Sequence, residues 1–199
     1  MISGIILLNV EGRVSRMLSN EIVDPRDVPD GFAVWYHGSA TDFQVIDLSQ
    51  SGVFKDFGPG FYLGTSYALA VARARTMQVR RKSEHAYVYV YFVPQHFSSK
   101  LKVRVFKRVP SFAWLDFIQA CWSTPRYKHG QDVIMGPTAD SHPQNEITRY
   151  KAGVFGAVGS DGAKRGLIAA LKAHKLGYQM CLATKAAVQE VKFYTRKEV

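Results

Sequence analysis

Residues 56–65 read DFGPGFYLGT, a glycine-rich turn followed by aromatic residues, and the fold can be argued outward from this stretch. Glycines let the chain turn sharply and approach other segments closely. Thr65 and Ser66 are residue types that cap helix N-termini, and apolar residues at helical spacing follow from Tyr67 to about Val79. One face of this predicted helix carries Leu69, Ala72, Thr76 and Val79.

A buried strand is predicted on each side of this unit. Residues 32–36, FAVWY, form a short apolar run that stops at the His37-Gly38-Ser39 triplet. Residues 86–93, AYVYVYFV, alternate cleanly, with tyrosines on one face of a strand and valines and phenylalanine on the other. The tyrosine stripe is either cross-strand packing or a platform on which nucleic-acid bases stack.

The rest of the chain mixes strands and helices without a regular βαβ repeat. Further strands are predicted at 101–106, 131–137, 178–184 and 191–196. Helices are predicted at 111–122, at about 163–175 with Gly177 as the left-handed residue after the helix, and as a short turn at 185–190. We therefore expect one α+β domain over residues 32–199, after an N-terminal extension, 1–31, with a short strand from Ile5 to Val10.

Composition excludes several classes of protein. The 199 residues contain no apolar run of about 18 residues, so no membrane span is expected, and the first residues lack the basic start of a signal peptide. The two cysteines, Cys121 and Cys181, are too few for a disulfide scaffold and suit a cytoplasmic protein. Both lie in apolar runs, where thiols pack as small hydrophobic groups, and the six histidines show no zinc-ligand spacing, so no metal is expected.

Positive charge is concentrated in one part of the chain. The formal net charge is +10, and residues 71–108 contain ten basic side chains against one acid, Glu84. Such a stretch favours an anionic partner, although a solvated helix face and a charged edge strand would have the same composition. The basic residues are Arg73, Arg75, Arg80, Arg81, Lys82, Lys100, Lys102, Arg104, Lys107 and Arg108.

Three strand-associated pieces together point to a known superfamily. They are WYHGS at 35–39, DFGPGFYLGT at 56–65 and GYQMCLAT at 177–184. YHGS and GFYLGT resemble the first two motifs of ADP-ribosyltransferases of the histidine–tyrosine–glutamate type. With SFAWLDFI, QDVIMGPTAD and VKF in the same order, the chain from about 34 to 194 resembles more closely a bacterial family called domain of unknown function 3990, placed in that superfamily. The resemblance implies a split-sheet ADP-ribosyltransferase fold with an NAD cleft.

The resemblance also implies roles for individual residues. His37 would bind the adenosine ribose, the backbone of Gly38 would pair with the nicotinamide carboxamide, and Ser39 would add a hydroxyl contact. Tyr62 would stack on the nicotinamide, on a turn shaped by Gly58 and Gly60. A pyridinium cation suits the negative face of a tyrosine ring.

The sequence departs from the family pattern at two positions. Where the superfamily has a ribose-binding glutamate, this chain has Gln179, which accepts a hydrogen bond but carries no charge. Glu190 is a candidate for the missing carboxylate. Where the family has an aromatic residue on the helix, usually tryptophan, this chain has Arg73, which would repel a pyridinium and favour a phosphate. Tyr67 is a candidate for the missing ring. Asp132 and Asp140 are either loop caps or part of the cleft wall.

The function that the resemblance implies is mono-ADP-ribosyl transfer from NAD to a protein or nucleic-acid acceptor, with Tyr62, Gln179 and His37 as catalytic residues. Proteins of this superfamily act as bacterial toxins or effectors, in the cytoplasm or delivered into a target cell by a non-classical route, and a cognate antitoxin is a further partner. The basic stretch would face the acceptor or the pyrophosphate. Two alternatives remain open: a noncatalytic nucleotide or nucleic-acid binding module on the same fold, and an NAD glycohydrolase.

Overall fold

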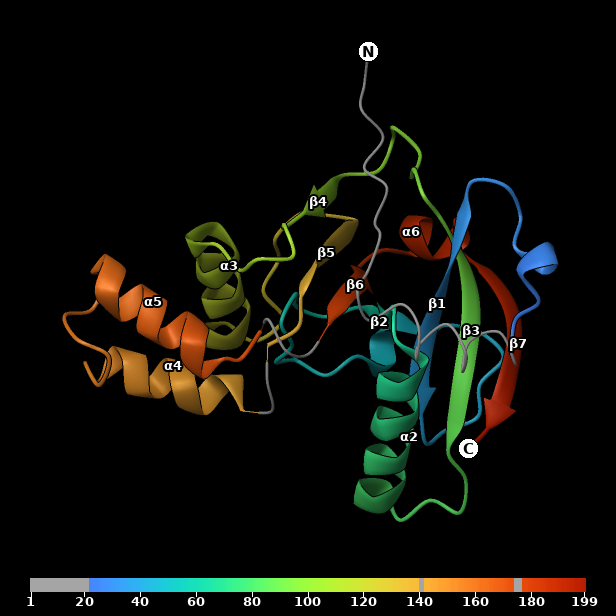
Figure 1. Ribbon diagram of the computed structural model, residues 1–199, viewed down its shortest axis with the longest axis horizontal. Helices are drawn as coiled ribbons and strands as arrows, with labels where there is room; N and C mark the ends of the chain where they lie inside the picture. Colours follow the sequence, from blue (N-terminus) through green and yellow to red (C-terminus); the bar gives the residue numbers. More distant parts are fainter. Residues whose placement is uncertain (1–21, 140–141, 174–176) are drawn as a thin grey trace.

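Seven strands form one mixed sheet in the order β4-β5-β6-β2-β1-β3-β7 (Figure 1). The computed structural model describes residues 22–139, 142–173 and 177–199. Neighbouring strands are antiparallel except β4 and β5, which are parallel. The strands are β1 (Phe32–Ser39), β2 (Phe61–Gly64), β3 (Tyr87–Pro94), β4 (Val103–Val105), β5 (Val133–Pro137), β6 (Tyr178–Leu182) and β7 (Lys192–Glu198). The strands predicted within the described residues are thus confirmed, except that β1 continues through the triplet at which it was expected to stop.

Five α-helices surround this sheet in the described residues, together with two short 3-10 helices. They are α2 (Tyr67–Arg81), α3 (Phe112–Ser123), α4 (Pro143–Lys151), α5 (Asp161–Ala170) and α6 (Lys185–Gln189); the 3-10 helices are η1 (Pro25–Asp27) and η2 (Leu48–Gln50). Ser66, Ser111, Ser160 and Thr184 cap four of the α-helices through side-chain oxygens that accept backbone N–H groups. The result is a single α+β domain, and no helix of the described residues is long and apolar enough to cross a membrane.

Strand β3, which lies between β1 and β7, is buried on both faces, which explains its run of aromatic and β-branched residues. Val88, Val90 and Phe92 pack under α2, whereas Tyr89 and Tyr91 pack on the opposite face with α6. Tyr89 is 1% exposed and stacks on Phe43, with ring centroids 4.0 Å apart. The tyrosine stripe is therefore cross-strand packing, and two of its three rings are too deeply buried to stack on bases.

Helix α2 has the expected extent but buries a different face. Tyr67, Ala70 and Ala74 are buried, whereas Leu69 and Val79 are 44% and 78% exposed. The small alanines allow the helix to lie close to β1, whereas Leu69 and Val79 face away from that contact. The predicted face was therefore wrong, because the size of the side chains, and not their hydrophobicity alone, decides which face fits the sheet.

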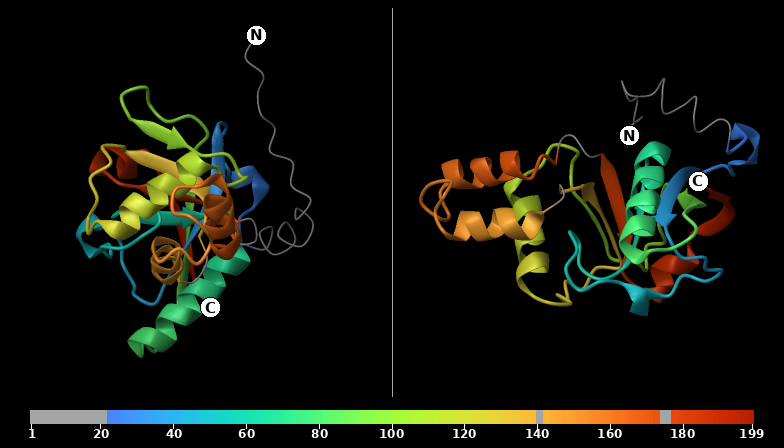
Figure 2. Two further views of the ribbon diagram at one scale, coloured as in Figure 1. Left: turned by 90° about the vertical axis from the view of Figure 1, so that its left-hand side faces the viewer. Right: turned by 90° about the horizontal axis from the view of Figure 1, so that it is seen from below.

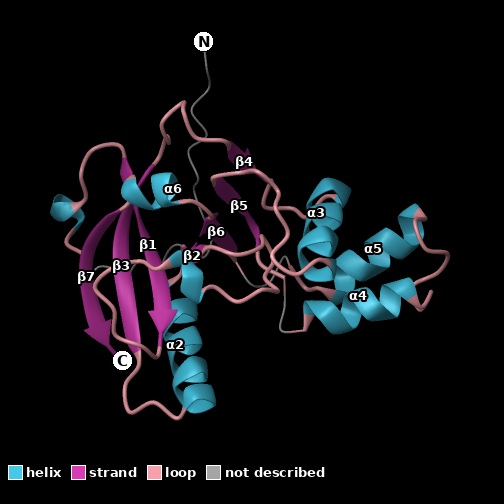
Figure 3. Ribbon diagram, turned by 180° about the vertical axis from the view of Figure 1, so that it is seen from behind, coloured by secondary structure: helices cyan, strands magenta, loops and turns pink. Residues whose placement is uncertain are grey.

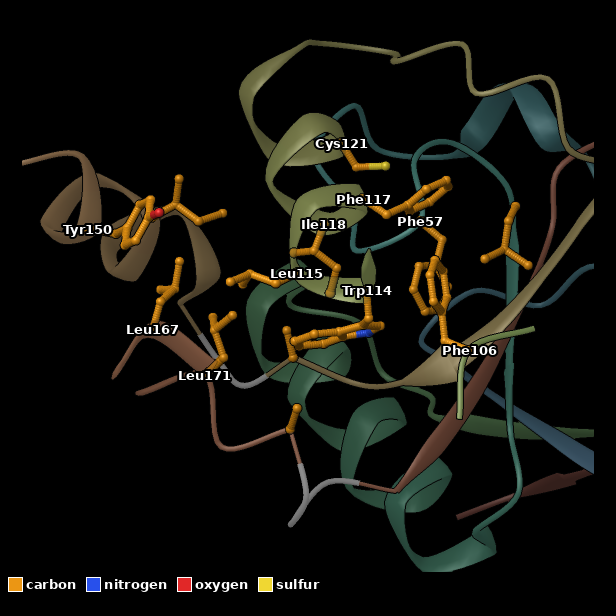
Figure 4. Close-up of a cluster of buried hydrophobic side chains, with 14 of the residues drawn as sticks. Phe57, Phe106, Trp114, Leu115, Phe117, Ile118, Cys121, Tyr150, Leu167 and Leu171 are labelled. Atoms are coloured by element: carbon orange, nitrogen blue, oxygen red, sulfur yellow. The ribbon is translucent and has the colours of Figure 1, made fainter. Parts of the chain in front are cut away.

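Helices α3, α4 and α5 build a second core beside β5 and β6. Figure 4 shows Trp114 and Leu115 of α3, Tyr150 of α4 and Leu167 of α5 meeting in this core, where all are at most 4% exposed. Helix α4 was not predicted from the sequence. Helix α5 was predicted too late in the chain: it ends at Ala170, so Gly177, with φ +86°, does not terminate it. The predicted strand at Ile5–Val10 lies outside the described residues.

The sheet is nearly divided between β1 and β2. These strands share one register pair, Tyr36 with Gly64, while β1 pairs with β3 along its full length from Phe32 to Ser39. On the other side, β2 pairs with β6 from Phe61 to Gly64. Beyond Tyr36, the end of β1 therefore has a neighbouring strand on one side only, and this gap is where the candidate site lies.

Candidate functional site

A cleft of about 760 Å³ opens at the gap between β1 and β2. Residues of helix α2, Trp122 and residues 138–139 are among those that line it. Figures 1 and 3 show α2 beside β1 and β2. Seven of the eight site residues predicted from the sequence line this cleft, although they come from segments more than a hundred residues apart. They are His37, Gly38, Ser39, Gly60, Tyr62, Arg73 and Gln179.

His37 bridges the gap in the sheet with its side chain. Its Nδ1 lies 2.7 Å from the carbonyl oxygen of Tyr62, and because a carbonyl only accepts, the proton is on Nδ1. The ring stacks on Phe61, with centroids 4.4 Å apart. Burial, helped by the charges of Arg73 and Lys55, lowers the pKa of His37 to about 4 despite the opposing effect of the hydrogen bond to Tyr62. The imidazole is therefore neutral near pH 7, and Nε2 is left as an acceptor for a ligand hydroxyl.

The hydroxyl of Tyr62 holds the glycine-rich turn. It donates to the carbonyl oxygen of Gly58 (2.6 Å) and accepts from the N–H of Phe57 (3.0 Å). Burial raises the pKa of Tyr62 well above its ordinary value, so the phenol stays protonated. Gly58 has φ +74°, a left-handed conformation that favours glycine. The hydroxyl is thus occupied by the turn, and the ring is what Tyr62 can offer to a ligand.

Two glycines permit close contacts between segments that wall the cleft. A Cβ on Gly38 would lie 2.1 Å from the carbonyl oxygen of Ala70 and 2.9 Å from the nitrogen of Ala74, both backbone atoms of α2. A Cβ on Gly60 would lie 2.4 Å from Sγ of Cys181. Gly38 is therefore needed for the packing of α2 on β1, a purely structural demand that the sequence analysis did not anticipate.

Gln179 is held by a buried carboxylate, Asp56. Its Nε2 donates to Oδ2 of Asp56 at 2.7 Å. The same carboxylate accepts from the N–H of Ala139 (2.9 Å) and from Nε1 of Trp122 (3.0 Å). In the part of the chain that the structure describes, Asp56 is the only charged residue that is buried, at 8% exposure. Burial raises the pKa of Asp56, while its three donors and the nearby Lys55 oppose this effect.

Of the two α2 residues predicted to line the site, Arg73 does so and Tyr67 does not. Arg73 is exposed on α2 and lines the cleft, eleven residues after Tyr62. Tyr67 does not line it: the ring is 8% exposed and packs edge-on against Tyr36 at 5.5 Å, so it does not supply the missing aromatic group. Ser39 lines the cleft, but its hydroxyl already donates to the carbonyl of Thr41 and accepts from the N–H of the same residue.

Two acidic candidates lie away from the cleft. Glu190 accepts from the N–H of Ser98 at 2.9 Å and is not among the residues that line the cleft, so it does not replace the glutamate. Asp132 is a loop cap, because it accepts from the N–H of Lys102 and from the hydroxyl of Thr184. Asp140 lies outside the described residues.

The basic stretch does not form a single surface. Arg73, Arg80 and Arg81 line the cleft, whereas Arg104 and Arg108 lie over the rings of Phe106 and Tyr178 near β4. Both cysteines are free and buried, and burial raises the pKa of each thiol to about 12, so neither is a ready nucleophile. Within the described ranges, no group of His, Cys, Asp or Glu side chains could hold a metal ion.

Sequence reasoning missed several residues of the cleft. Lys55, Asp56, Phe61 and Trp122 all line it, and none was assigned a role. A role for Asp56 could have been inferred, since an acid that begins the apolar turn DFGPG is either exposed or, if buried, held by hydrogen-bond donors. A role for Trp122 could not, because its contact with Asp56 joins positions 66 residues apart.

Comparison with known proteins identifies the family of this chain. No curated protein and no solved structure matches it. One family model does, over residues 33–193, which include every strand and helix around the cleft. The chain belongs to this family, described as protein of unknown function DUF3990.

Proposed function

We propose that this protein transfers ADP-ribose from NAD to a macromolecular acceptor, releasing nicotinamide, on a split-sheet ADP-ribosyltransferase fold. One observation carries the proposal. Six residues chosen from three motifs of the sequence, together with Arg73 of α2, line a single cleft, at the point where β1 and β2 separate. A chance resemblance in short motifs would not gather His37, Tyr62 and Gln179 around one opening.

The reaction breaks the bond between C1′ of the ribose and the nicotinamide nitrogen. Its transition state resembles an oxocarbenium ion, as in glycoside hydrolysis. Nicotinamide leaves with the electron pair of that bond, and a nucleophile of the acceptor bonds to C1′ and gives up its proton to water. The site must therefore orient two partners and limit the access of bulk water.

The described side chains suit three parts of this task. Neutral His37 offers Nε2 to a ribose hydroxyl, because Nδ1 is committed to Tyr62. The ring of Tyr62 offers a face for the nicotinamide, while its hydroxyl stays on Gly58 and the N–H of Phe57. At the end of β1, Gly38 lines the cleft, where its backbone N–H and carbonyl are the groups it can offer to the carboxamide.

Asp56 would supply the negative charge that Gln179, unlike a glutamate, does not carry. Since Nε2 of Gln179 donates to Asp56, its Oε1 remains to accept from the 2′-hydroxyl of the ribose. The carboxylate of Asp56 lines the same cleft and brings a negative charge within one hydrogen bond of that amide. A fixed negative charge near a developing cation lowers the energy of the transition state. Gln179 would thus bind the ribose hydroxyl and Asp56 would provide the charge, two functions that a single glutamate combines in the superfamily.

The test is release of nicotinamide and transfer of label from biotinylated NAD, with and without cell lysate. Wild type should release nicotinamide and label an acceptor, and Tyr62→Ala should lose both. Tyr62→Phe is the matched control: it keeps the ring and should retain labelling, while loss of the hydroxyl contacts lowers the free energy of unfolding by about 1–3 kcal/mol.

Other results would assign the alternatives. Nicotinamide release without label makes water the acceptor and the protein an NAD glycohydrolase. Absence of both release and an NAD-dependent thermal shift overturns the proposal in favour of a noncatalytic binding module. The free cysteines suit a reducing cytosol, in the producing cell or in a target cell, where a toxin or effector with a cognate antitoxin would act.

A further inference from the structure

Three arginines form a row along one face of α2. Arg80 and Arg81 follow Arg73 by seven and eight residues, which is about two turns of the helix and returns them to the side of Arg73. Met77 lies between Arg73 and Arg80 in the sequence. All four line the cleft. At 1.5 Å of rise per residue the row extends over about 10–12 Å. The left view of Figure 2 shows the C-terminal end of α2 projecting past the rest of the described chain, so the row leads from the cleft outward.

The charges of this row are not balanced by acids. Lys55 faces the same cleft from the opposite loop, and the charges of Arg73, Arg80 and Arg81 help burial to lower the pKa of Lys55. Among the ion pairs of the described residues, none includes any of these four cations.

The acids that line the cleft have other partners. Asp47 caps η2 by accepting from Ser49 and Gln50, and Asp56 accepts from Gln179, Trp122 and Ala139. Asp56 lies near Lys55 and Arg73 and offsets part of their charge, but it is one carboxylate against four cations. Cations held together in this way repel one another, and an anionic ligand relieves that repulsion.

The length of the row indicates which anion fits it. The two phosphates of NAD adjoin each other, and its pyridinium is itself a cation. A stacked nucleic-acid strand carries one phosphate for each 3.4 Å or so of axis, so the row would contact about three phosphates of such a strand. The cleft also contains flat apolar surface: the rings of Phe54 and Trp122 are nearly parallel, at 11°, with centroids 6.4 Å apart. Aromatic faces beside a basic track are what proteins use to hold single strands.

We propose that the cleft and the basic row of α2 bind a single-stranded nucleic acid. Binding itself does not depend on catalysis. Resting on the proposed function, the strand would be the acceptor, because the row begins at Arg73, in the same cleft as Tyr62 and Gln179.

The test is fluorescence anisotropy of labelled single strands of about 12 nucleotides, DNA and RNA, titrated at several salt concentrations. One phosphate contact for each of the three arginines and one for Lys55 should give a slope of log K against log salt of about −2.8. Arg80→Gln/Arg81→Gln removes two of these contacts and should bring the slope to about −1.4. Arg75→Gln/Lys82→Gln is the matched control. It removes the same charge from α2 and its C-cap residue at exposed positions outside the cleft, and its slope should stay near that of wild type.

Three outcomes would overturn the inference. The first is an equal loss of binding in the two double variants, with melting temperatures that show both to be folded. The second is binding that does not respond to salt. The third is polyglutamate that displaces the strand at equal charge concentration, which would make an acidic protein surface the partner.

Failure of this inference can be distinguished from failure of the transferase activity. Nicotinamide release and NAD-dependent thermal shift, measured without any oligonucleotide, test the transferase alone. Labelled NAD that marks the strand supports both proposals. Label on protein only, with no strand bound, overturns this inference and leaves the transferase standing.

Discussion

Nε2 of Gln179 donates to Oδ2 of Asp56 across 2.7 Å, a contact between residues 123 positions apart in the sequence. The bond fixes which end of the amide faces the carboxylate and therefore which end remains for a ligand. Asp56 is in turn fixed by Trp122 and by the N–H of Ala139, so the amide is positioned by a network and not by a single flexible contact.

Asp56→Asn should reduce nicotinamide release on the order of 100-fold, because Gln179 loses its fixed orientation and the site loses its negative charge. An asparagine offers an amide N–H where three donors converge, which should also cost about 1–3 kcal/mol of unfolding free energy. Burial raises the pKa of Asp56, so wild-type activity should fall as the pH drops through that raised value, and the variant should lack this acidic limb.

The control for this variant is Asp132→Asn. Asp132 also accepts two hydrogen bonds, from Lys102 and Thr184, but lies outside the cleft. It should lower stability and leave the rate per folded molecule and its pH profile unchanged. If Asp132→Asn and Asp56→Asn slow the reaction equally, Asp56 has no role beyond stability.

Arg73→Trp should raise the affinity for NAD and lower the affinity for oligonucleotide. The variant restores the aromatic residue that the family pattern has on this helix, and it removes a cation that would repel the pyridinium. We expect about a tenfold gain in NAD affinity, or ~1.4 kcal/mol, by isothermal titration calorimetry. Position 73 is exposed, so the fold should tolerate the change. Weaker binding of NAD to the variant would show that Arg73 contacts the pyrophosphate instead.

The sequence predicted those parts of the fold that depend on local pattern. Strand β3 follows from strict alternation, and helices α2 and α3 from a serine cap followed by apolar residues at helical spacing. Helix α4 was missed because it is polar: residues 143–151, PQNEITRYK, bury only Pro143, Ile147 and Tyr150. Its stability comes from packing against α3 and α5, which a local pattern does not contain.

In the candidate site, too, the residues that belong to local motifs could be predicted and their tertiary partners could not. His37, Tyr62 and Gln179 could be found because each stands in a motif with fixed neighbours. The partners that set their chemistry could not, since the bonds of His37 to Tyr62 and of Gln179 to Asp56 join separate strands and loops. The face of α2 was predicted wrongly for a related reason: which alanines must approach Gly38 depends on the path of β1, not on the helix.

The neutral state of His37 should be visible in the pH dependence of stability. Burial lowers the pKa of His37 to about 4 in the folded chain, against an ordinary value of 6.5. Between these values the unfolded chain binds a proton that the folded chain does not, so stability falls as the pH drops from about 6.5 toward 4. From pH 7 to pH 4.5 the expected loss from this residue is about 2–3 kcal/mol.

His37→Gln isolates this contribution. Glutamine can still donate to the carbonyl of Tyr62 but does not titrate, so urea unfolding of the variant should show a correspondingly smaller loss between the two pH values. Carboxylates elsewhere affect both proteins alike and cancel in the comparison. Equal pH dependence in wild type and variant would mean that His37 is charged or exposed in the folded protein.

Gly38→Ala tests whether the contact of α2 with β1 shapes the cleft. The new Cβ would lie 2.1 Å from the carbonyl oxygen of Ala70, a backbone atom that cannot turn aside, so α2 must move. We expect a loss on the order of 3 kcal/mol in urea unfolding. Gly64→Ala, in β2 opposite Tyr36, is the matched control, because a Cβ there meets nothing within 4 Å. Its stability should change by less than about 1 kcal/mol. Since α2 carries Arg73 and Arg80, movement of the helix in folded Gly38→Ala should weaken the binding of oligonucleotide and of NAD together. If Gly38→Ala and Gly64→Ala have equal stability and equal binding, α2 does not lie against β1 as closely as the structure shows.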